Sequence, residues 1–82
     1  KLIKKSFKYS IKIADFYFED TAKSMTYRIK RETTIKKVNI KKLSKTKYRV
    51  LLGQYDNINS LQKAFNDINI LEFENIEFIK ND

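Results

Sequence analysis

The sequence predicts an α+β domain of βαββαβ order, with a four-stranded antiparallel sheet and two helices on one of its faces. Apolar and polar residues alternate in four short stretches, as they do in half-buried strands. Between the first two and the last two stretches, apolar residues recur at helical spacing. Both halves repeat this pattern at the same offsets, counted from Ala14 and from Gly53. The matching helix positions are Ala22, Met25 and Ile29, and then Leu61, Ala64 and Ile68.

In the first half, residues 7–13 alternate as a strand that places Tyr9, Ile11 and Ile13 on one face. A helix is expected to begin at 19–21, where acidic and capping residues suit a helix start. It ends at 33–34, because paired threonines favour extended chain.

In the second half, strands are predicted at 35–43 and 47–55, joined by the polar turn 44–46. The stretch 47–55 is apolar on both faces near its middle, which is typical of a central strand. A turn and cap at 56–59, a helix to Ile68, a connection over 69–75 and a strand at 76–79 complete the chain. The right-handed crossover rule puts the first and third strands in the centre, a ferredoxin-like arrangement.

The composition limits the kinds of function. A chain of 82 residues makes one domain with a modest core, and we expect a basic linker at 1–6 and the domain at 7–82. Since the chain has no cysteine or histidine, thiolate metal sites and the usual general base are missing, and we expect no cofactor. No apolar run reaches the ~20 residues of a membrane span. Because the chain begins with Lys1, we expect a piece of a longer protein.

Charge is distributed unevenly along the chain. Residues 1–49 hold 16 Lys and Arg against 4 Asp and Glu, whereas residues 50–82 hold 2 against 6. A basic first part favours an anionic partner, which could be nucleic acid, a membrane surface or an acidic polysaccharide. A lysine-rich surface that only contacts water explains the same count.

We find no nucleophile–base pair and no phosphate loop, so an enzyme active site is not expected. Asp15, Glu19 and Asp20 are expected to cap the first helix.

Alternation also assigns residues to the open face of the sheet, away from the helices. The residues assigned to the helix face are Tyr9, Ile11, Ile13, Val38, Ile40, Tyr48, Val50 and Leu52. The residues assigned to the open face are Ser10, Lys12, Lys37, Asn39, Lys41, Lys47, Arg49 and Leu51. A shift of one residue in any strand would exchange its two sets. The open face is therefore expected to be shallow, with a cationic centre.

Two stretches resemble the SPOR domain (sporulation-related repeat). They are Ile11–Phe16, followed by Ala22, and Tyr48–Tyr55, followed by Ala64; the resemblance covers about residues 7–80. It implies a βαββαβ fold that binds septal peptidoglycan without catalysis, at glycan strands stripped of stem peptides. Such domains often end cell-division proteins, amidases or the lytic transglycosylase rare lipoprotein A. The resemblance thus implies a periplasmic or cell-envelope module that targets a larger protein during cell division.

The resemblance also implies which residues contact glycan. Lys12 and Asp15 stand where the family has glutamine and serine, Arg49 is the family's third-strand arginine, and Lys47 takes a position that is often aromatic. The full expected set is Ser10, Lys12, Asp15, Asn39, Lys47, Arg49 and Leu51. The three cations could meet the lactyl carboxylates of muramic acid, with Arg49 in a two-point contact. Arg49 could instead form a cross-strand ion pair with an acid such as Glu77.

Two other functions remain open. RNA-recognition modules share this fold, which is therefore also called RNP-like, but they stack bases on aromatic residues of the open face. Alternation points Tyr9 and Tyr48 inward, which argues against RNA, although a slipped register would reverse this. A protein-interaction domain that uses an exposed sheet edge is the third possibility. We expect a monomer whose partner is peptidoglycan, with no nucleic acid and no membrane span in this stretch.

Overall fold

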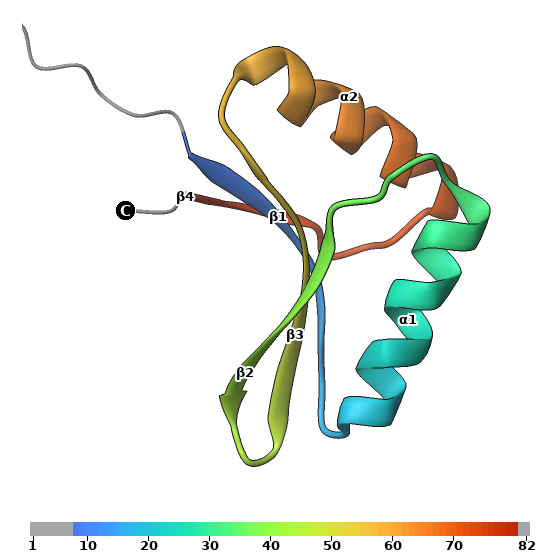
Figure 1. The fold of residues 1–82 in the computed structure, drawn as a ribbon, viewed down its shortest axis with the longest axis vertical. Coiled ribbons are helices and arrows are strands. Elements are labelled where there is room, and N and C mark those ends of the chain that lie inside the picture. Colours follow the sequence, from blue (N-terminus) through green and yellow to red (C-terminus); the bar gives the residue numbers. More distant parts are fainter. Residues whose placement is uncertain (1–7, 81–82) are drawn as a thin grey trace, which may run out of the picture.

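A computed structural model describes residues 8–80, and its elements follow the predicted order (Figure 1). The strands are β1 (Tyr9–Phe16), β2 (Val38–Ser44), β3 (Lys47–Tyr55) and β4 (Glu77–Lys80). The helices are α1 (Glu19–Glu32), α2 (Ile58–Ile68) and a short 3-10 helix η1 (Asn69–Leu71). The predicted linker at 1–6, Phe7 and residues 81–82 lie outside the described residues.

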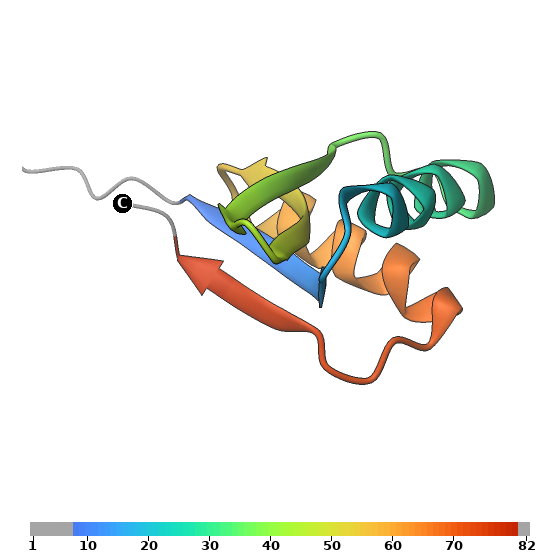
Figure 2. The ribbon, with the colours of Figure 1, turned by 90° about the horizontal axis from the view of Figure 1, so that it is seen from below.

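The four strands form one antiparallel sheet in the order β2-β3-β1-β4. The predicted central position of the first and third strands is therefore confirmed, as is the ferredoxin-like βαββαβ arrangement. Helix α1 packs on β1, β2 and β3, and α2 packs on β1 and β3. Both helices lie on the same side of the sheet, so the other face carries no helix from the described residues (Figures 1 and 2).

The core lies between the sheet and the two helices, and both halves of the repeat contribute to it. Ile11, Val50 and Leu52 on the central strands are fully buried. The helix residues at the repeated offsets from Ala14 and Gly53 face these strand residues. Met25 is half-buried, and the other five are buried: Ala22, Ile29, Leu61, Ala64 and Ile68. Burial of these apolar side chains is the main stabilising term for so small a domain.

The two helices begin differently. At α2, the Oδ1 atom of Asn57 accepts a hydrogen bond from the backbone N–H of Ser60 at 2.8 Å, which caps the helix as predicted. At α1, Phe18 occupies the capping position and no side chain caps the helix. The expected capping by Asp15, Glu19 and Asp20 is therefore wrong. Two of these acids lie in the first helical turn, where the helix dipole favours them, and Asp15 lies in β1.

A bulge in β1 interrupts the simple alternation. Lys12 pairs with Leu51, and Asp15 pairs with Arg49. Between these two pairs β1 has two residues, whereas β3 has only Val50, which lies opposite Ala14. The extra residue on β1 is Ile13, which is buried, and Ala14 also packs against the core. Uninterrupted alternation would have put Asp15 on the helix face. The bulge instead brings its carboxylate to the open face.

A second irregularity lies at the end of β3. Between its pairs with β1 at Leu52 and Tyr55, β3 carries one residue more than β1, and this stretch contains Gly53 and Gln54. Gly53 has a φ of +100°, a backbone conformation that residues other than glycine rarely adopt. The only glycine of the chain thus permits the bend that leads β3 to the start of α2.

Candidate functional site

The open face is built from two rows of cross-strand neighbours, and residues directly opposite each other point to the same side of a sheet. The first row contains Asn39, Leu51, Lys12 and Glu77, from β2, β3, β1 and β4. The second row contains Lys41, Arg49 and Asp15, from β2, β3 and β1. Six of the seven expected glycan contacts therefore lie on or beside one surface, because Lys47 shares the face of Arg49 two residues along β3.

Arg49 and Asp15 make the tightest contact on this surface. The Nε atom of Arg49 donates to Oδ1 of Asp15 at 2.8 Å, and Nη2 donates to Oδ2 at 3.2 Å. This two-point contact matches the planar guanidinium to the carboxylate. The hydrogen bond from Arg49 holds the pKa of Asp15 below its ordinary value, and the Asp15 carboxylate raises the pKa of Arg49. Both groups are therefore charged near neutral pH. The expected alternative, an ion pair of Arg49 with an acid, is thus present, with Asp15 as the acid in place of Glu77.

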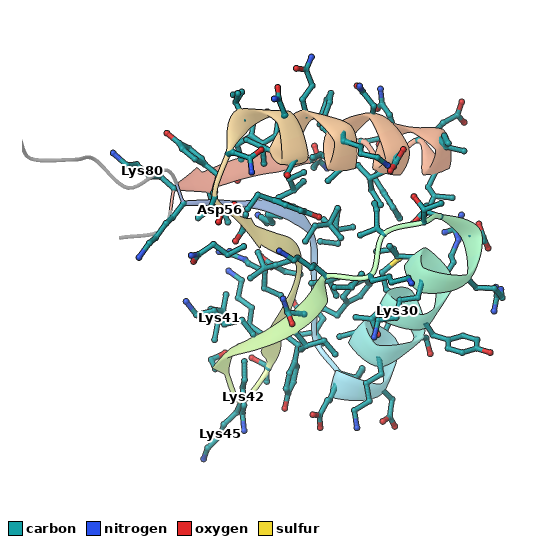
Figure 3. The ribbon with its side chains drawn as sticks, turned by 45° about the horizontal axis from the view of Figure 1, so that its top comes forward. Lys30, Lys41, Lys42, Lys45, Asp56 and Lys80 are labelled. Carbon is teal, nitrogen blue, oxygen red and sulfur yellow. The ribbon has the colours of Figure 1, made fainter. Side chains whose placement is uncertain are left out.

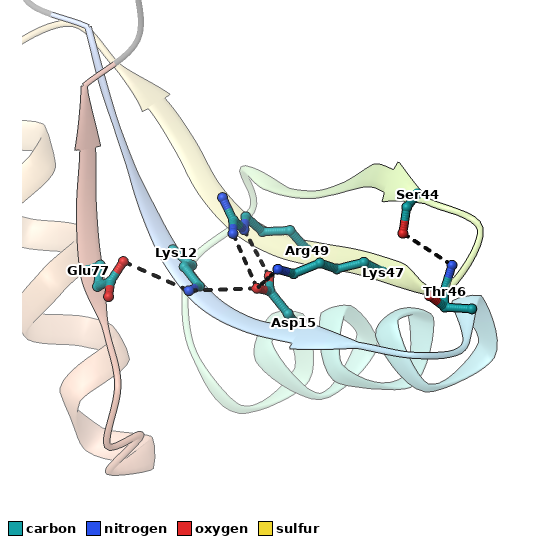
Figure 4. A network of polar contacts seen from close by, with 7 residues as sticks. All are labelled: Lys12, Asp15, Ser44, Thr46, Lys47, Arg49 and Glu77. Carbon is teal, nitrogen blue, oxygen red and sulfur yellow. Dashed lines mark hydrogen bonds and ion pairs between the residues drawn. The ribbon is translucent and has the colours of Figure 1, made fainter.

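Two lysines complete a cluster around Asp15, which we call the Asp15 cluster: Lys12, Asp15, Lys47, Arg49 and Glu77. The Nζ atoms of Lys12 and Lys47 lie 3.7 Å and 3.8 Å from Oδ2 of Asp15, and Lys12 also lies 3.8 Å from Oε1 of Glu77 (Figure 4). Three cations share two carboxylates, so the cluster has one positive charge in excess. The Asp15 side chain is 21% exposed and that of Lys47 is 51% exposed. Lys47 is therefore the cation that an incoming ligand reaches most easily.

The other expected contacts differ in their access to solvent. Asn39 is exposed, and its Nδ2 donates to the backbone oxygen of Gly53. Leu51 is half-buried and lies in the first row, between Asn39 and Lys12. Ser10 is only 6% exposed, beside Ile79 of β4, so little of it is offered to a ligand. Lys37, assigned to the open face by alternation, precedes β2 and lies with its Nζ 5.6 Å from the centre of the Tyr55 ring.

The tyrosines that decide the RNA alternative do not provide a stacking surface on the open face. Tyr9 and Tyr48 both pack against the core. Tyr48 lies opposite Phe16 and Lys42, on the side away from Arg49, and the Lys42 ammonium lies 6.0 Å from its ring centre. The register predicted for β1 and β3 at these positions therefore holds.

Two shallow hollows flank the Asp15 cluster. The hollow at the β2–β3 hairpin encloses about 340 Å³ and is lined by Asp15, Phe16, Tyr17, Ser44, Thr46 and Lys47. The hollow beside β4 encloses about 510 Å³ and is lined by Lys12, Ile13, Ala14, Asp15, Glu72, Phe73, Glu74 and Asn75. Of these lining residues the sequence predicted Lys12, Asp15 and Lys47 as part of the site. It did not predict the residues of the turns, because those are brought beside β1 only by the folded sheet. The aromatic run at 16–18, directly after a strand, was the one available signal.

Lysines continue beyond the cluster along β2 and its turn. Residues 36–47 contain six lysines and no acidic residue. Figure 3 shows Lys41, Lys42 and Lys45 projecting from β2 and the hairpin. This edge of the sheet therefore carries the positive charge predicted from the first half of the sequence. The acids of the second half, such as Glu72 and Glu74, line the opposite hollow.

Comparisons with known proteins return no match. No protein-family model, no curated protein and no solved structure matches the chain. Within residues 8–80, no three Asp or Glu side chains gather closely enough to hold a metal ion, and no helix has the length and apolar character needed to cross a bilayer.

Proposed function

We propose that this domain binds peptidoglycan without catalysis, through its open sheet face, and directs a larger envelope protein to septal glycan strands that lack stem peptides. The observation that carries the proposal is the Asp15 cluster, an excess of cationic groups on a sheet face that no described helix covers. The resemblance of Ile11–Phe16 and Tyr48–Tyr55 to the SPOR domain supports the same ligand.

The chemistry of the ligand fits this surface. A glycan strand without stem peptides carries a lactyl carboxylate on each muramic acid residue, so negative charges recur along a polymer. A shallow, open face suits a polymer better than an enclosed cavity does. Lys47 is accessible enough to meet one carboxylate directly, and charge-assisted contacts of this kind are about twice as strong as neutral hydrogen bonds. Leu51 and Asn39 lie in the row that contains Lys12, where they can contact a sugar face and its N-acetyl group.

The state of Asp15 also supports a binding role. Its pKa is lowered by Arg49, so its carboxylate is ionised near neutral pH and has no proton to donate. Its contact with three cations also weakens it as a base. The most prominent carboxylate of the open face thus stabilises cations, and it is unsuited to the acid–base work that cleavage of a glycan requires.

The test is retention on purified sacculi, with and without amidase treatment that removes stem peptides. The wild-type domain is expected to be retained more strongly after treatment. A double variant, Lys12→Ala with Lys47→Ala, should lose this preference. Its matched control is Lys23→Ala with Lys30→Ala, which removes two charges from α1, on the other side of the sheet. Equal retention on treated and untreated sacculi would contradict the proposal, and competition by single-stranded RNA would favour the RNA alternative.

A further inference from the structure

The hollow at the hairpin end of the open face has features that the proposed binding cluster alone does not explain. Tyr17 lines it and is 75% exposed, and the adjacent Phe18 is 72% exposed. Single exposed apolar residues are common, but an exposed aromatic side chain that lines a hollow and has a second exposed aromatic residue next to it in the chain indicates a contact surface. Tyr17 follows Asp15 by two residues, and both line this hollow.

The polar lining of this hollow suits sugar hydroxyl groups. Ser44 and Lys47 are cross-strand partners at the start of the β2–β3 hairpin. The Oγ atom of Ser44 accepts a hydrogen bond from the backbone N–H of Thr46 at 3.3 Å, which leaves its own hydroxyl proton to be donated elsewhere (Figure 4). Beside the Asp15 carboxylate, the hollow thus combines the Tyr17 ring, the hydroxyl groups of Ser44 and Thr46 and the ammonium group of Lys47.

Charge distinguishes the two ends of the open face. The hollow beside β4 is lined by Glu72 and Glu74, and Glu77 lies at the same end of the cluster. These carboxylates repel an anionic polymer. The hairpin hollow lies among Lys47 and the lysines of β2 and its turn, which attract one. An anionic glycan that occupies the centre of the face is therefore favoured to continue toward the hairpin.

From these features we propose that the glycan extends from the Asp15 cluster into the hairpin hollow, where the Tyr17 ring stacks against one sugar. This inference rests on the proposed function and adds a second sugar subsite and a direction to it. The negative face of the ring meets the C–H groups on the flat side of a pyranose. Ser44 and Thr46 bind the hydroxyl groups at the edge of that sugar, and Lys47 lies between the two subsites, within reach of a carboxylate in either.

The experiment measures the affinity of peptide-free glycan fragments of increasing length by calorimetry. Tyr17→Ala should weaken the binding of long fragments roughly fivefold to tenfold, the size of one aromatic contact. It should hardly affect fragments too short to leave the Asp15 cluster, and Tyr17→Phe should bind like the wild type. Tyr27→Ala, which removes a tyrosine that is 65% exposed on α1, is the matched control and should change nothing.

The outcomes separate this inference from the function it rests on. If Tyr17→Ala binds every fragment normally while Lys12→Ala with Lys47→Ala loses binding, the second subsite is wrong and the proposed function stands. If the wild type binds no fragment, both are wrong. If Tyr17→Ala loses only the binding of anionic lipid vesicles, the aromatic residues contact a membrane and the subsite is refuted. Amide chemical shifts measured on adding a long fragment give the direction: changes at Ser44 and Tyr17 support it, and changes confined to Glu72 and Glu74 overturn it.

Discussion

Arg49 and Asp15 join the two central strands by a two-point contact, with Nε–Oδ1 and Nη2–Oδ2 distances of 2.8 Å and 3.2 Å. The β1 bulge at Ile13 makes this contact possible, because it turns Asp15 to the face on which Arg49 lies. Within the proposed site, the guanidinium of Arg49 is therefore already bound by a carboxylate of the protein. A carboxylate on the ligand must share Arg49 with Asp15 or bind the lysines beside it.

Replacing Asp15 by Asn should separate the structural role of the pair from its role in binding. The partly buried guanidinium of Arg49 would lose its charged partner, which we expect to lower the free energy of unfolding by about 1–3 kcal/mol. The affinity for peptide-free glycan should rise severalfold, because the cluster gains one net positive charge and ligand carboxylates no longer compete. Thermal melting and calorimetry measure the two effects.

Asp56→Asn is the matched control for this change, since it removes the same charge from the exposed turn before α2 (Figure 3). It should alter neither quantity appreciably. A fall in glycan affinity for Asp15→Asn would show that Asp15 itself contacts the ligand, as the family resemblance implies. An unchanged melting temperature would show that the ion pair does not stabilise the sheet.

The lowered pKa of Asp15 predicts how stability changes in acid. Its folded-state pKa lies below the ordinary value of 3.8, mainly because of the hydrogen bond from Arg49. The ionised group thus contributes stability that is complete above that value and is lost as the pH falls through the lowered pKa. Urea unfolding between about pH 5 and pH 2 should show this loss in the wild type and a smaller one in Asp15→Asn. Parallel curves for the two proteins would refute the link.

The sequence predicts most of this fold because the same pattern of apolar residues recurs in both halves of the chain. Ile11, Val50 and Leu52 alternate as buried strand residues, and the order of elements then leaves little choice of topology. The β1 bulge could not be predicted, since Ile13 and Ala14 are compatible with either face. For the same reason the Asp15–Arg49 pair could not be found by alternation, although the family resemblance implied that both residues belong to one site.

Gly53 is predicted to tolerate no side chain. At its φ of +100° an added Cβ atom would lie 2.8 Å from Cδ2 of Tyr55, and the backbone conformation itself disfavours L-residues. Gly53→Ala should lower the free energy of unfolding by about 2 kcal/mol or more, from backbone strain together with overpacking. Urea unfolding measures the loss. The neighbouring exposed residue gives the control, Gln54→Ala, which should change stability by less than about 0.5 kcal/mol. Equal effects of the two changes would contradict the argument.

The buried Tyr55 predicts how stability changes in alkaline solution. Its side chain is buried next to the bend at Gly53, and burial together with the nearby Asp67 raises its pKa above the ordinary value of 10.0. Because the folded state binds this proton more tightly than the unfolded state does, the stabilisation is complete below that value and is lost as the pH rises through the raised pKa. Stability measured by urea unfolding should therefore fall in alkaline solution.

Tyr55→Phe tests this origin of the alkaline loss, since it keeps the ring that packs in the core and removes the ionising hydroxyl group. The variant should be close to the wild type in stability near neutral pH and should lose less stability as the pH rises above about 10. Ultraviolet absorbance near the tyrosinate band follows the ionisation directly, and the variant should lack the titration step of Tyr55. If the wild type and the variant lose stability in parallel, the ionisation of another group must cause the unfolding, and Tyr55 is then only a packing residue.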